Sequence, residues 1–526
     1  MMKSHYDFVV VGSGAAGAAA AWRLCQKGYR VVCLERGKNL FPENYPSTKT
    51  NWELKKRGEF SPIASSRRLD SDYPVDDSES PIAVCNYNAV GGSTILYSAH
   101  FPRFRPRDFK IHSEDGLYED WPISYEDLKP YFELNESEMS VSGLVGDPMY
   151  PDIENLLPPV PMGNTGETIA KAFNQKGWHW WPSYGAISTR SVKGRDACIN
   201  LGPCNTGCPQ GAKSSVDITY LARAKRLGLT VLTECAVDSV IVEGDRAKGV
   251  IYFDKTGARH ELIAENVVLA ASAIGTPRIL LNSKDETEKS IANSSGLIGK
   301  NLMIHPLGYV EGVFDETLDT DIGPQGCLIY SLEHYRSENK DFNLGYMMHV
   351  LRGTGPIETA TSALSRRKLR FGQALEEDFF KFYKKQIAIS IICDDLPQES
   401  NCVELSDVND RFGTPGVKIK YEVSENTLRM MKDGMANARE ILSLAGANKT
   451  YAYGPVRNTG WHIMGTCKMG NDPNNSVVNA IGESHDVKRL FVIDSSCFVT
   501  GSCVNPANTI QSLALYLTDK IINCYG

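Results

Sequence analysis

Several features are missing from this sequence of 526 residues, and each absence removes a class of protein. No uncharged stretch reaches the roughly 20 residues of a membrane-spanning helix, so we expect no transmembrane segment. The 56 Lys and Arg are outnumbered by 63 Asp and Glu, and the net charge is -7. Because phosphate backbones are bound by clustered Lys and Arg, we expect no nucleic-acid partner. No HExxH or paired metal-ligand spacing occurs, so we predict no catalytic metal.

The opening residues also do not have the pattern of a secretory leader, and we expect none. The opening stretch, MMKSHYDFVVVGSGAAGAAAAW, has an apolar run, but Gly12, Ser13 and Gly14 interrupt it and the three-part layout of a leader is lacking. Fourteen cysteines without such a leader are typical of reduced thiols. We therefore expect folded structure from the first residues onward and a cytoplasmic location.

The sequence does contain a β-α-β unit at its beginning. Residues 6–11, YDFVVV, predict a buried strand, residues 15–27 have helical composition, and residues 29–36 predict a second strand. The GSGAAG between them lets the backbone turn tightly and approach a pyrophosphate at the helix N-terminus. Glu35 closes the second strand, where an acid can bind a ribose 2′-hydroxyl. This unit predicts a dinucleotide site, and the acid favours FAD or NAD over NADP.

Further strand and helix patterns follow along the chain, and its composition changes at about residue 311. Residues 229–254 alternate like strands joined by a hairpin, and residues 264–283 predict another strand, glycine turn and helix. From about 311 to 453, aromatic-rich strand candidates alternate with a charged segment, 366–385, which we expect to be the solvated face of a helix. Residues 489–524 return to a buried strand and a helix, so we expect the end of the chain to rejoin the first domain.

Five motifs give the chain a resemblance to a known family. They are DFVVVGSGAAGAAAAWRL, VGGST with a downstream arginine and Asp108, VVLAASAIGTPRILLNSKD, GLIGKNLMIHP, and HIMGTCKMG followed by VIDSSCFVTGSCVNPANTIQSLAL. In this order they resemble the glucose-methanol-choline (GMC) family of flavin oxidoreductases over nearly the whole chain. The resemblance implies FAD on a Rossmann-type domain, with a less constrained substrate domain over the isoalloxazine ring.

Together these patterns predict an α/β fold in which a Rossmann-type FAD-binding domain carries a discontinuous α+β substrate-binding domain built on an antiparallel sheet. The predicted FAD-binding domain comprises residues 1–310 and 455–526, with surface excursions near 39–80 and 140–195, and the predicted substrate-binding domain comprises residues 311–454.

A histidine among small residues in GWHIMGTCKMG and an asparagine in CVNPANTIQ are the candidate catalytic residues. An imidazole titrates near neutrality and can act as a base, whereas an amide can only orient or stabilise an oxygen. The resemblance implies that His462 accepts the proton of a substrate hydroxyl while the carbinol hydride moves to flavin N5, and that Asn505 hydrogen-bonds the same oxygen. The implied reaction is oxidation of a primary or secondary alcohol, with a sugar or glycoside hydroxyl as one candidate.

The resemblance also implies cofactor contacts. GGSTIL would bring amides and hydroxyls to the pyrophosphate or flavin, Val237 matches the position that meets the adenine, and Asp494 opens the segment that passes the pyrophosphate and ribityl chain. Some family members attach FAD through a histidine in this loop; Ile95 stands there, so we expect non-covalent FAD. The predicted cofactor-binding residues are Gly12, Gly14, Ala15, Ala16, Gly17, Glu35, Gly91, Gly92, Ser93, Thr94, Val237, Asp494, Asn505 and Pro506.

Other histidines and the tryptophans are weaker candidates. His305 lies in NLMIHP, a motif that is structural in the family, and we expect a structural role. His100, near the glycine loop, is interpreted as either a flavin contact or a polar surface residue. Residues 176–183, KGWHWWPS, concentrate three of the seven tryptophans, for which we favour packing over ligand contact.

Three alternatives stay open. Flavin reoxidation would use dioxygen or an external electron acceptor, and the substrate partner is a small alcohol or carbohydrate. Some multi-subunit members of the family carry an iron–sulfur cluster in the region of Cys198, Cys204 and Cys208, and this chain would then be the catalytic subunit of an electron-transfer dehydrogenase. The spacing of these cysteines is not the bacterial cluster pattern. We therefore favour structural thiols or a local disulfide. A lyase that keeps the flavin without net redox chemistry, as in plant hydroxynitrile lyases of the family, is the alternative reaction.

Overall fold

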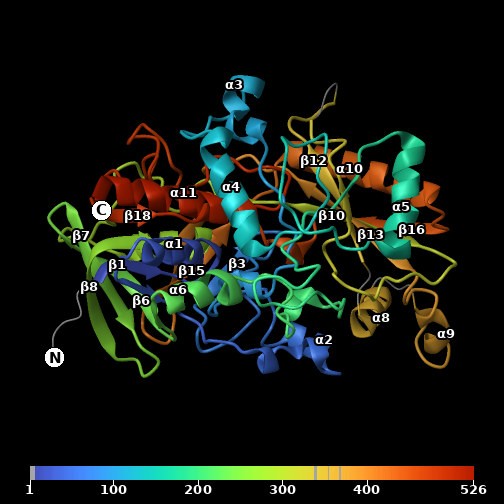
Figure 1. Cartoon of the computed structure of the whole chain (residues 1–526), viewed down its shortest axis with the longest axis horizontal. Helices are drawn as coiled ribbons and strands as arrows, with labels where there is room; N and C mark the ends of the chain where they lie inside the picture. The colour runs from blue at the N-terminus through green and yellow to red at the C-terminus, as the bar shows by residue number, and fades with distance from the viewer. Residues whose placement is uncertain (1–5, 337–339, 353–354, 366–368, 526) are drawn as a thin grey trace.

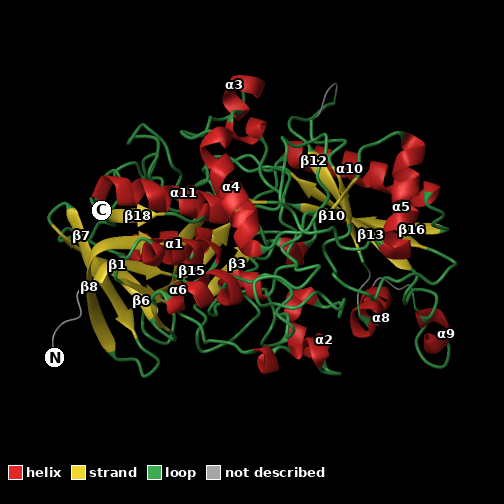
Figure 2. Ribbon diagram, viewed as in Figure 1, coloured by secondary structure: helices red, strands yellow, loops and turns green. Residues whose placement is uncertain are grey.

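The computed structural model describes residues 6–336, 340–352, 355–365 and 369–525 (Figure 1). Its strands gather in two main regions at opposite ends of the long axis, with loops and helices between them (Figure 2). The C-terminal strand and helix lie beside the N-terminal elements, so the two ends of the chain meet in one half of the molecule (Figure 1). This is the α/β fold that the sequence predicts.

The first sheet is built around the N-terminal β-α-β unit. Four neighbouring strands are parallel, and the sheet continues into an antiparallel meander, while β18 pairs in parallel with the end of β8. In spatial order the strands are β5 (Thr230–Leu232), β2 (Val31–Leu34), β1 (Tyr6–Val11), β8 (Arg259–Leu269), β7 (Arg246–Phe253) and β6 (Ala236–Glu243), with β18 at Leu490–Val492. The predicted first strand and the predicted hairpin of β6 and β7 are confirmed.

Small side chains allow the first helix to be buried deeply. Helix α1 (Ala15–Gln26) has the sequence AAGAAAAWRLCQ, and its alanines from 18 to 21 are inaccessible to solvent. It packs against α11 (Ala507–Tyr525), which is buried along most of its length. Helix α4 (Tyr125–Met139) lies against α11. Its N-cap is Ser124, whose hydroxyl accepts the Asp127 N–H at 3.2 Å. The end of the chain is therefore part of the first core.

The second sheet has six antiparallel strands and its own apolar core. In spatial order the strands are β16 (Lys449–Tyr453), β10 (Leu307–Val313), β13 (Gln386–Cys393), β12 (Tyr346–Leu351), β11 (Ile329–Ser331) and β4 (Trp181–Pro182). The long helix α10 (Glu425–Leu444) packs on this sheet, and α5 (Gly163–Lys176) packs on α10 (Figure 1). The division of the chain into domains at residues 310 and 454 stays a prediction; the sheet itself includes β10 and the short β4.

Two smaller sheets each contact α7 (Ser272–Asn282). The three-stranded sheet consists of β14 (Cys402–Asn409), β15 (Pro415–Lys420) and β3 (Val75–Glu79). The two-stranded sheet pairs β17 (Ile463–Met464) with β9 (Met303–Ile304), and this pairing places the residues that flank both strands side by side. The remaining helices are α2 (Trp52–Arg57), α3 (Ile111–Asp115), α6 (Ala222–Arg226), α8 (Pro356–Ser365) and α9 (Leu375–Phe379).

The charged segment 366–385 differs from the prediction. Residues 366–368 lie outside the described residues, and the rest forms turns around the single-turn helix α9. Gly372 adopts φ +91°, outside the helical region, and the carboxylate of Asp378 binds Arg370 Nε at 2.7 Å and Lys381 Nζ at 2.6 Å. The expected helix through this run is therefore wrong for its described part: a glycine turn and a local ion-pair cluster replace it.

Candidate functional site

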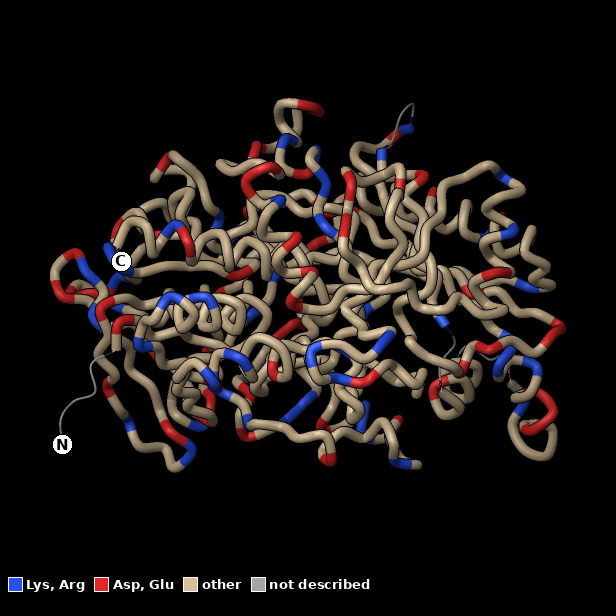
Figure 3. The backbone as a smooth tube through the Cα atoms, viewed as in Figure 1, with Lys and Arg blue, Asp and Glu red and all other residues tan. Residues whose placement is uncertain are grey.

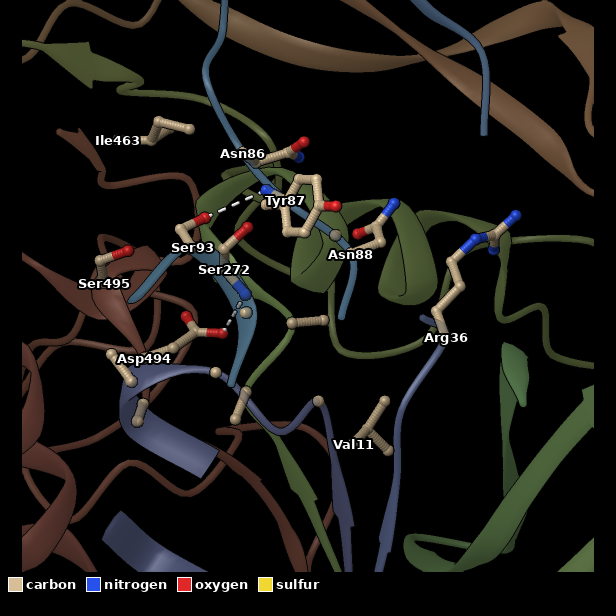
Figure 4. A pocket seen from close by; sticks show the side chains of 18 of the residues that line it. Val11, Arg36, Asn86, Tyr87, Asn88, Ser93, Ser272, Ile463, Asp494 and Ser495 are labelled. Atoms are coloured by element: carbon tan, nitrogen blue, oxygen red, sulfur yellow. Dashed lines mark hydrogen bonds between the residues drawn. The ribbon is translucent and has the colours of Figure 1, made fainter. Parts of the chain in front are cut away.

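A cavity lies at the carboxyl ends of the parallel strands of the first sheet, where ligands bind in folds of this kind. Figure 4 shows Val11, the last residue of β1, below Asn86 and Tyr87 from the loop after β3, while the side chain of Arg36, which follows β2, reaches up to the level of Asn88. The predicted cofactor residues that line it are Gly12, Gly14, Ala15, Ala16, Glu35, Gly92, Ser93, Thr94, Val237, Asp494 and Pro506. Gly17, Gly91 and Asn505 do not line it, although each is next in sequence to a residue that does.

Two glycine loops meet at the floor of the cavity. Gly12 has φ +96°, and a Cβ there would lie 2.5 Å from the Ala270 carbonyl oxygen. A Cβ on Gly92, at φ +53°, would lie 2.8 Å from the Cα of Gly14. Gly91 donates its N–H to Ser13 O at 3.2 Å, which ties the second loop to the first. Side chains are therefore excluded, and backbone lines this part of the wall.

Glu35 is fixed by the same turn. Its Oε2 accepts the Ser13 N–H at 3.0 Å and the Ser13 hydroxyl at 2.6 Å, and its Oε1 accepts the Gly37 N–H at 2.8 Å. Burial raises the pKa of Glu35, whereas these three hydrogen bonds oppose that rise. Three of the roughly four acceptor sites of the carboxylate are used, and the remaining site, on Oε1, is available to a ribose hydroxyl.

Asp494 joins the C-terminal segment to the start of α7. Its Oδ2 accepts the Ser272 N–H at 2.8 Å (Figure 4). Oδ2 also accepts the Thr276 hydroxyl at 2.6 Å, and Oδ1 accepts the Ser496 N–H at 2.8 Å. Burial raises its pKa, and the hydrogen bonds counteract this. The carboxylate thus holds two parts of the cavity wall together that are distant in sequence.

The cavity fits the FAD that the resemblance implies. The meeting of Gly14 and Gly92 forms a cradle without side chains, which suits close approach of a pyrophosphate. Asn86, also in the wall, has a buried Oδ1 with no hydrogen-bond partner among the described residues. A bound ligand with N–H or O–H groups would satisfy that acceptor.

The candidate catalytic pair adjoins this cavity. Trp461 and Ile463 line it on either side of His462, and Pro506 lines it next to Asn505. Asn505 Nδ2 lies 2.9 Å from His462 Nε2. Burial lowers the pKa of His462 well below its ordinary 6.5, and His305 and His100 lower it further. The imidazole is therefore neutral near pH 7.

Two further histidines extend this pair. His305 follows β9, which pairs with β17, and its Nδ1 lies 3.0 Å from His462 Nδ1. His100 Nδ1 lies 2.8 Å from Asn505 Oδ1, and its ring stacks on His349 at 4.2 Å between centroids. His100 is 2% exposed, so the interpretation as a surface residue is wrong. No spacing rule connects residues 405 positions apart, so sequence reasoning missed this contact.

A buried lysine lies next to the cysteine group. Lys213 Nζ donates to the carbonyl oxygens of Ile95, Tyr97 and Cys204 at 2.7, 2.9 and 2.8 Å, and burial lowers its pKa to about 8. All fourteen cysteines are unpaired in the structure. Among the described residues, no group of three or more His, Cys, Asp or Glu has an arrangement that would hold a metal ion.

The tryptophan-rich segment packs away from the cavity. Trp178 and Trp180 lie against the core of the second sheet, and Trp181 is in β4. The indole N–H of Trp180 donates to Asn174 Oδ1 at 2.8 Å. None of the three lines the cavity, in keeping with the packing interpretation.

Charge is spread along the whole chain, with basic and acidic residues interspersed (Figure 3). None of the helices in the described residues combines the length and apolar character needed to cross a bilayer.

Comparisons with known proteins identify similar chains over nearly the full length. Two family models described as GMC oxidoreductase match residues 6–307 and 397–514. The 2-methyl-1,2-propanediol dehydrogenase of Mycolicibacterium austroafricanum is 38% identical over 98% of this chain and 95% of its own. The fructose dehydrogenase large subunit of Gluconobacter japonicus is 26% identical over 98% of both chains.

Solved structures share the fold. The crystal structure of pyridoxine 4-oxidase from Mesorbium loti is similar with a TM-score of 0.68 at 17% identity, covering 98% of this chain and 99% of the other. A structure that addresses FAD modification in formate oxidase of Aspergillus oryzae RIB40 is similar with a TM-score of 0.68 at 15% identity, covering 99% of both chains.

Proposed function

This chain belongs to the GMC oxidoreductase family of FAD-dependent enzymes that act on CH–OH groups, and on that premise we propose that it oxidises a small primary or secondary alcohol with His462 as base. Bound FAD supplies the acceptor for the carbinol hydride, at flavin N5.

The observation that carries the proposal is the contact between Asn505 Nδ2 and His462 Nε2. An amide nitrogen can only donate, so Nε2 must be the unprotonated nitrogen of the ring. A substrate hydroxyl that enters between the two would accept from Asn505 and donate its proton to His462 Nε2. This is the arrangement that a general base requires.

His305 supports the same protonation state. Because neutral His462 carries its single ring proton on Nδ1, it donates to His305 Nδ1 across the 3.0 Å contact. When Nε2 takes the substrate proton, the resulting imidazolium keeps this acceptor. We propose that His305 thereby stabilises the charged ring, beyond the structural role that the sequence predicts.

We propose that the glycine loops hold the pyrophosphate of FAD, with Glu35 on a ribose and Asp494 beside the segment that passes the cofactor. Ile95 has no nucleophilic atom, which supports non-covalent attachment. The unpaired cysteines support a reducing, cytoplasmic location.

For the substrate, we propose a small alcohol or polyol, with sugars and glycosides as further candidates. The support is the similarity to a 2-methyl-1,2-propanediol dehydrogenase and to a fructose dehydrogenase large subunit. The electron acceptor is dioxygen or a separate carrier.

Anaerobic mixing of the FAD-loaded protein with diols, simple alcohols and sugars tests this function. Loss of the oxidised flavin absorbance with one class would identify the substrate. Mixing the reduced protein with air then separates an oxidase, which recovers fast, from a dehydrogenase. Unchanged flavin with every compound, together with cyanohydrin cleavage, would overturn the proposal in favour of a lyase.

A further inference from the structure

We propose that His100 is a positioning residue, whose ring N–H holds the amide of Asn505 so that its nitrogen faces His462. The inference rests on the proposed function, because the amide orientation matters for catalysis only if His462 acts as the base. The side-chain hydrogen bond of His100 is to Asn505.

The donor and acceptor roles around Asn505 follow from chemistry. Its Oδ1 lies 2.8 Å from His100 Nδ1, and its Nδ2 lies 2.9 Å from His462 Nε2. An amide oxygen only accepts, so His100 must carry its proton on Nδ1. An amide nitrogen only donates, so His462 must leave Nε2 unprotonated. The tautomers of two histidines are thus coupled through one amide.

The reversed amide would have the opposite effect. Its oxygen would face His462 and accept a hydrogen bond only from a protonated Nε2. That tautomer has no lone pair on Nε2 to take the proton of a substrate hydroxyl. In the reversed orientation the amide nitrogen would also point its N–H at the N–H of His100. The proton on His100 Nδ1 therefore disfavours the inactive arrangement.

The ring of His100 is itself held in place. Its backbone forms an antiparallel bridge with Gly185, and the Phe101 N–H donates to Tyr184 O at 2.8 Å. The ring of His349 stacks on it with 19° between the planes, and His349 Nε2 donates to Gly326 O at 2.9 Å. A buried, stacked ring on a paired backbone has the rigidity that positioning needs.

His100 remains neutral in this environment. Burial lowers its pKa to about 4, although the hydrogen bond to Asn505 opposes the shift. Its Nε2 is buried and has no hydrogen-bond partner among the described residues, so no contact competes with Asn505 for the ring proton. The neutral ring presents its Nδ1–H to Asn505.

A matched pair of variants isolates that donor. In His100→Asn the amide nitrogen occupies the position of the ring Nδ1 and can donate to Asn505, whereas His100→Leu places methyl groups there. We expect His100→Leu to lower the limiting rate of anaerobic flavin reduction about tenfold, the value of one hydrogen bond of ordinary strength, with little change in substrate Kd. His100→Asn should restore most of that loss.

A double-mutant cycle tests whether the effect passes through Asn505. In an Asn505→Ala background, His100→Leu should cause no further loss of rate, because the group it positions is gone. If the fold-loss of rate in the double variant equals the product of the losses in the two single variants, the proposal is overturned. Bound FAD content and the melting temperature of each variant show whether it has folded and loaded.

A measurement independent of activity is the tautomer of His100 in the folded, FAD-loaded protein. In long-range proton–nitrogen spectra of protein labelled with ¹⁵N-histidine, the signals lost in His100→Asn belong to His100. We expect a neutral ring with its proton on Nδ1, and a shift of that nitrogen in Asn505→Ala. A proton on Nε2 would overturn the proposal. If no alcohol reduces the flavin while the Nδ1–H tautomer is found, the proposed function fails and the positioning of Asn505 stands.

Discussion

The two parts of the site are built in different ways. The proposed nucleotide part includes backbone from two short glycine-rich turns, at 12–16 and 92–94, each contiguous in sequence. The proposed catalytic part consists of side chains from separate segments: His100, His305, His462 and Asn505. Under the proposed function, the first part binds its ligand by shape and backbone N–H groups, and the second depends on which atom of each side chain carries a proton.

Removing the backbone cradle should have the largest effect. In Gly12→Ala the new Cβ lies 2.5 Å from Ala270 O, on a backbone with φ +96°. We expect loss of bound FAD and of all flavin reduction, because the turn must shift. Gly28→Ala is the control: φ is +88° but no atom lies within 4 Å of the new Cβ, so only about 1–2 kcal/mol of backbone strain is expected. Equal FAD content in the two variants would contradict this account of the turn.

Removing the base should leave the nucleotide part intact. In His462→Ala we expect bound FAD at the wild-type level and flavin reduction lowered about 10²–10⁴-fold, the range for loss of a general base. Anaerobic stopped-flow absorbance measures the rate, and His112→Ala, at an exposed site on α3, is the control. A normal rate in His462→Ala would remove the residue from the mechanism.

The pH dependence should report the environment of the base. Neutral His462 is the active form, so the rate is present above its pKa and is lost as pH falls through it. Because burial holds that pKa well below 6.5, the wild-type rate should persist at pH 6.5. In Asn505→Asp a carboxylate beside Nε2 favours the protonated ring, and the acid limb should move upward by on the order of 1–3 pH units. An unmoved limb would show that residue 505 does not face the base.

The smallest effect is expected outside both parts. Trp180 packs on the second core and bonds Asn174, and it does not line the cavity. In Trp180→Phe, flavin reduction and substrate Kd should remain close to wild type. A marked rise in Kd would place the tryptophan segment on the substrate path and revise the boundary of the site.

The sequence predicts those parts of the molecule that depend on contiguous residues. Strand β1, helix α1 and the turn between them follow from local signals: a β-branched run, small residues and glycines at fixed spacing. The candidate pair, His462 and Asn505, came from a resemblance of motifs. These signals are contained in short stretches, so one sequence suffices to identify them.

The contacts of His100 and His305 required the structure. Residue 305 reaches His462 because β9 pairs with β17, and His100 reaches Asn505 across 405 positions of chain. Tertiary pairing of this kind leaves no periodic signal. The charged segment near α9 departs from the prediction for a different reason, because Gly372 adopts φ +91° and interrupts the run ahead of α9.

The most direct test of the central claim is anaerobic flavin reduction by an alcohol and by the same alcohol deuterated at the carbinol carbon. The account predicts that the flavin absorbance disappears with both, more slowly with the deuterated compound, and that both rates collapse in His462→Ala. Flavin that stays oxidised with every alcohol tested, or a rate that does not depend on His462, would contradict it.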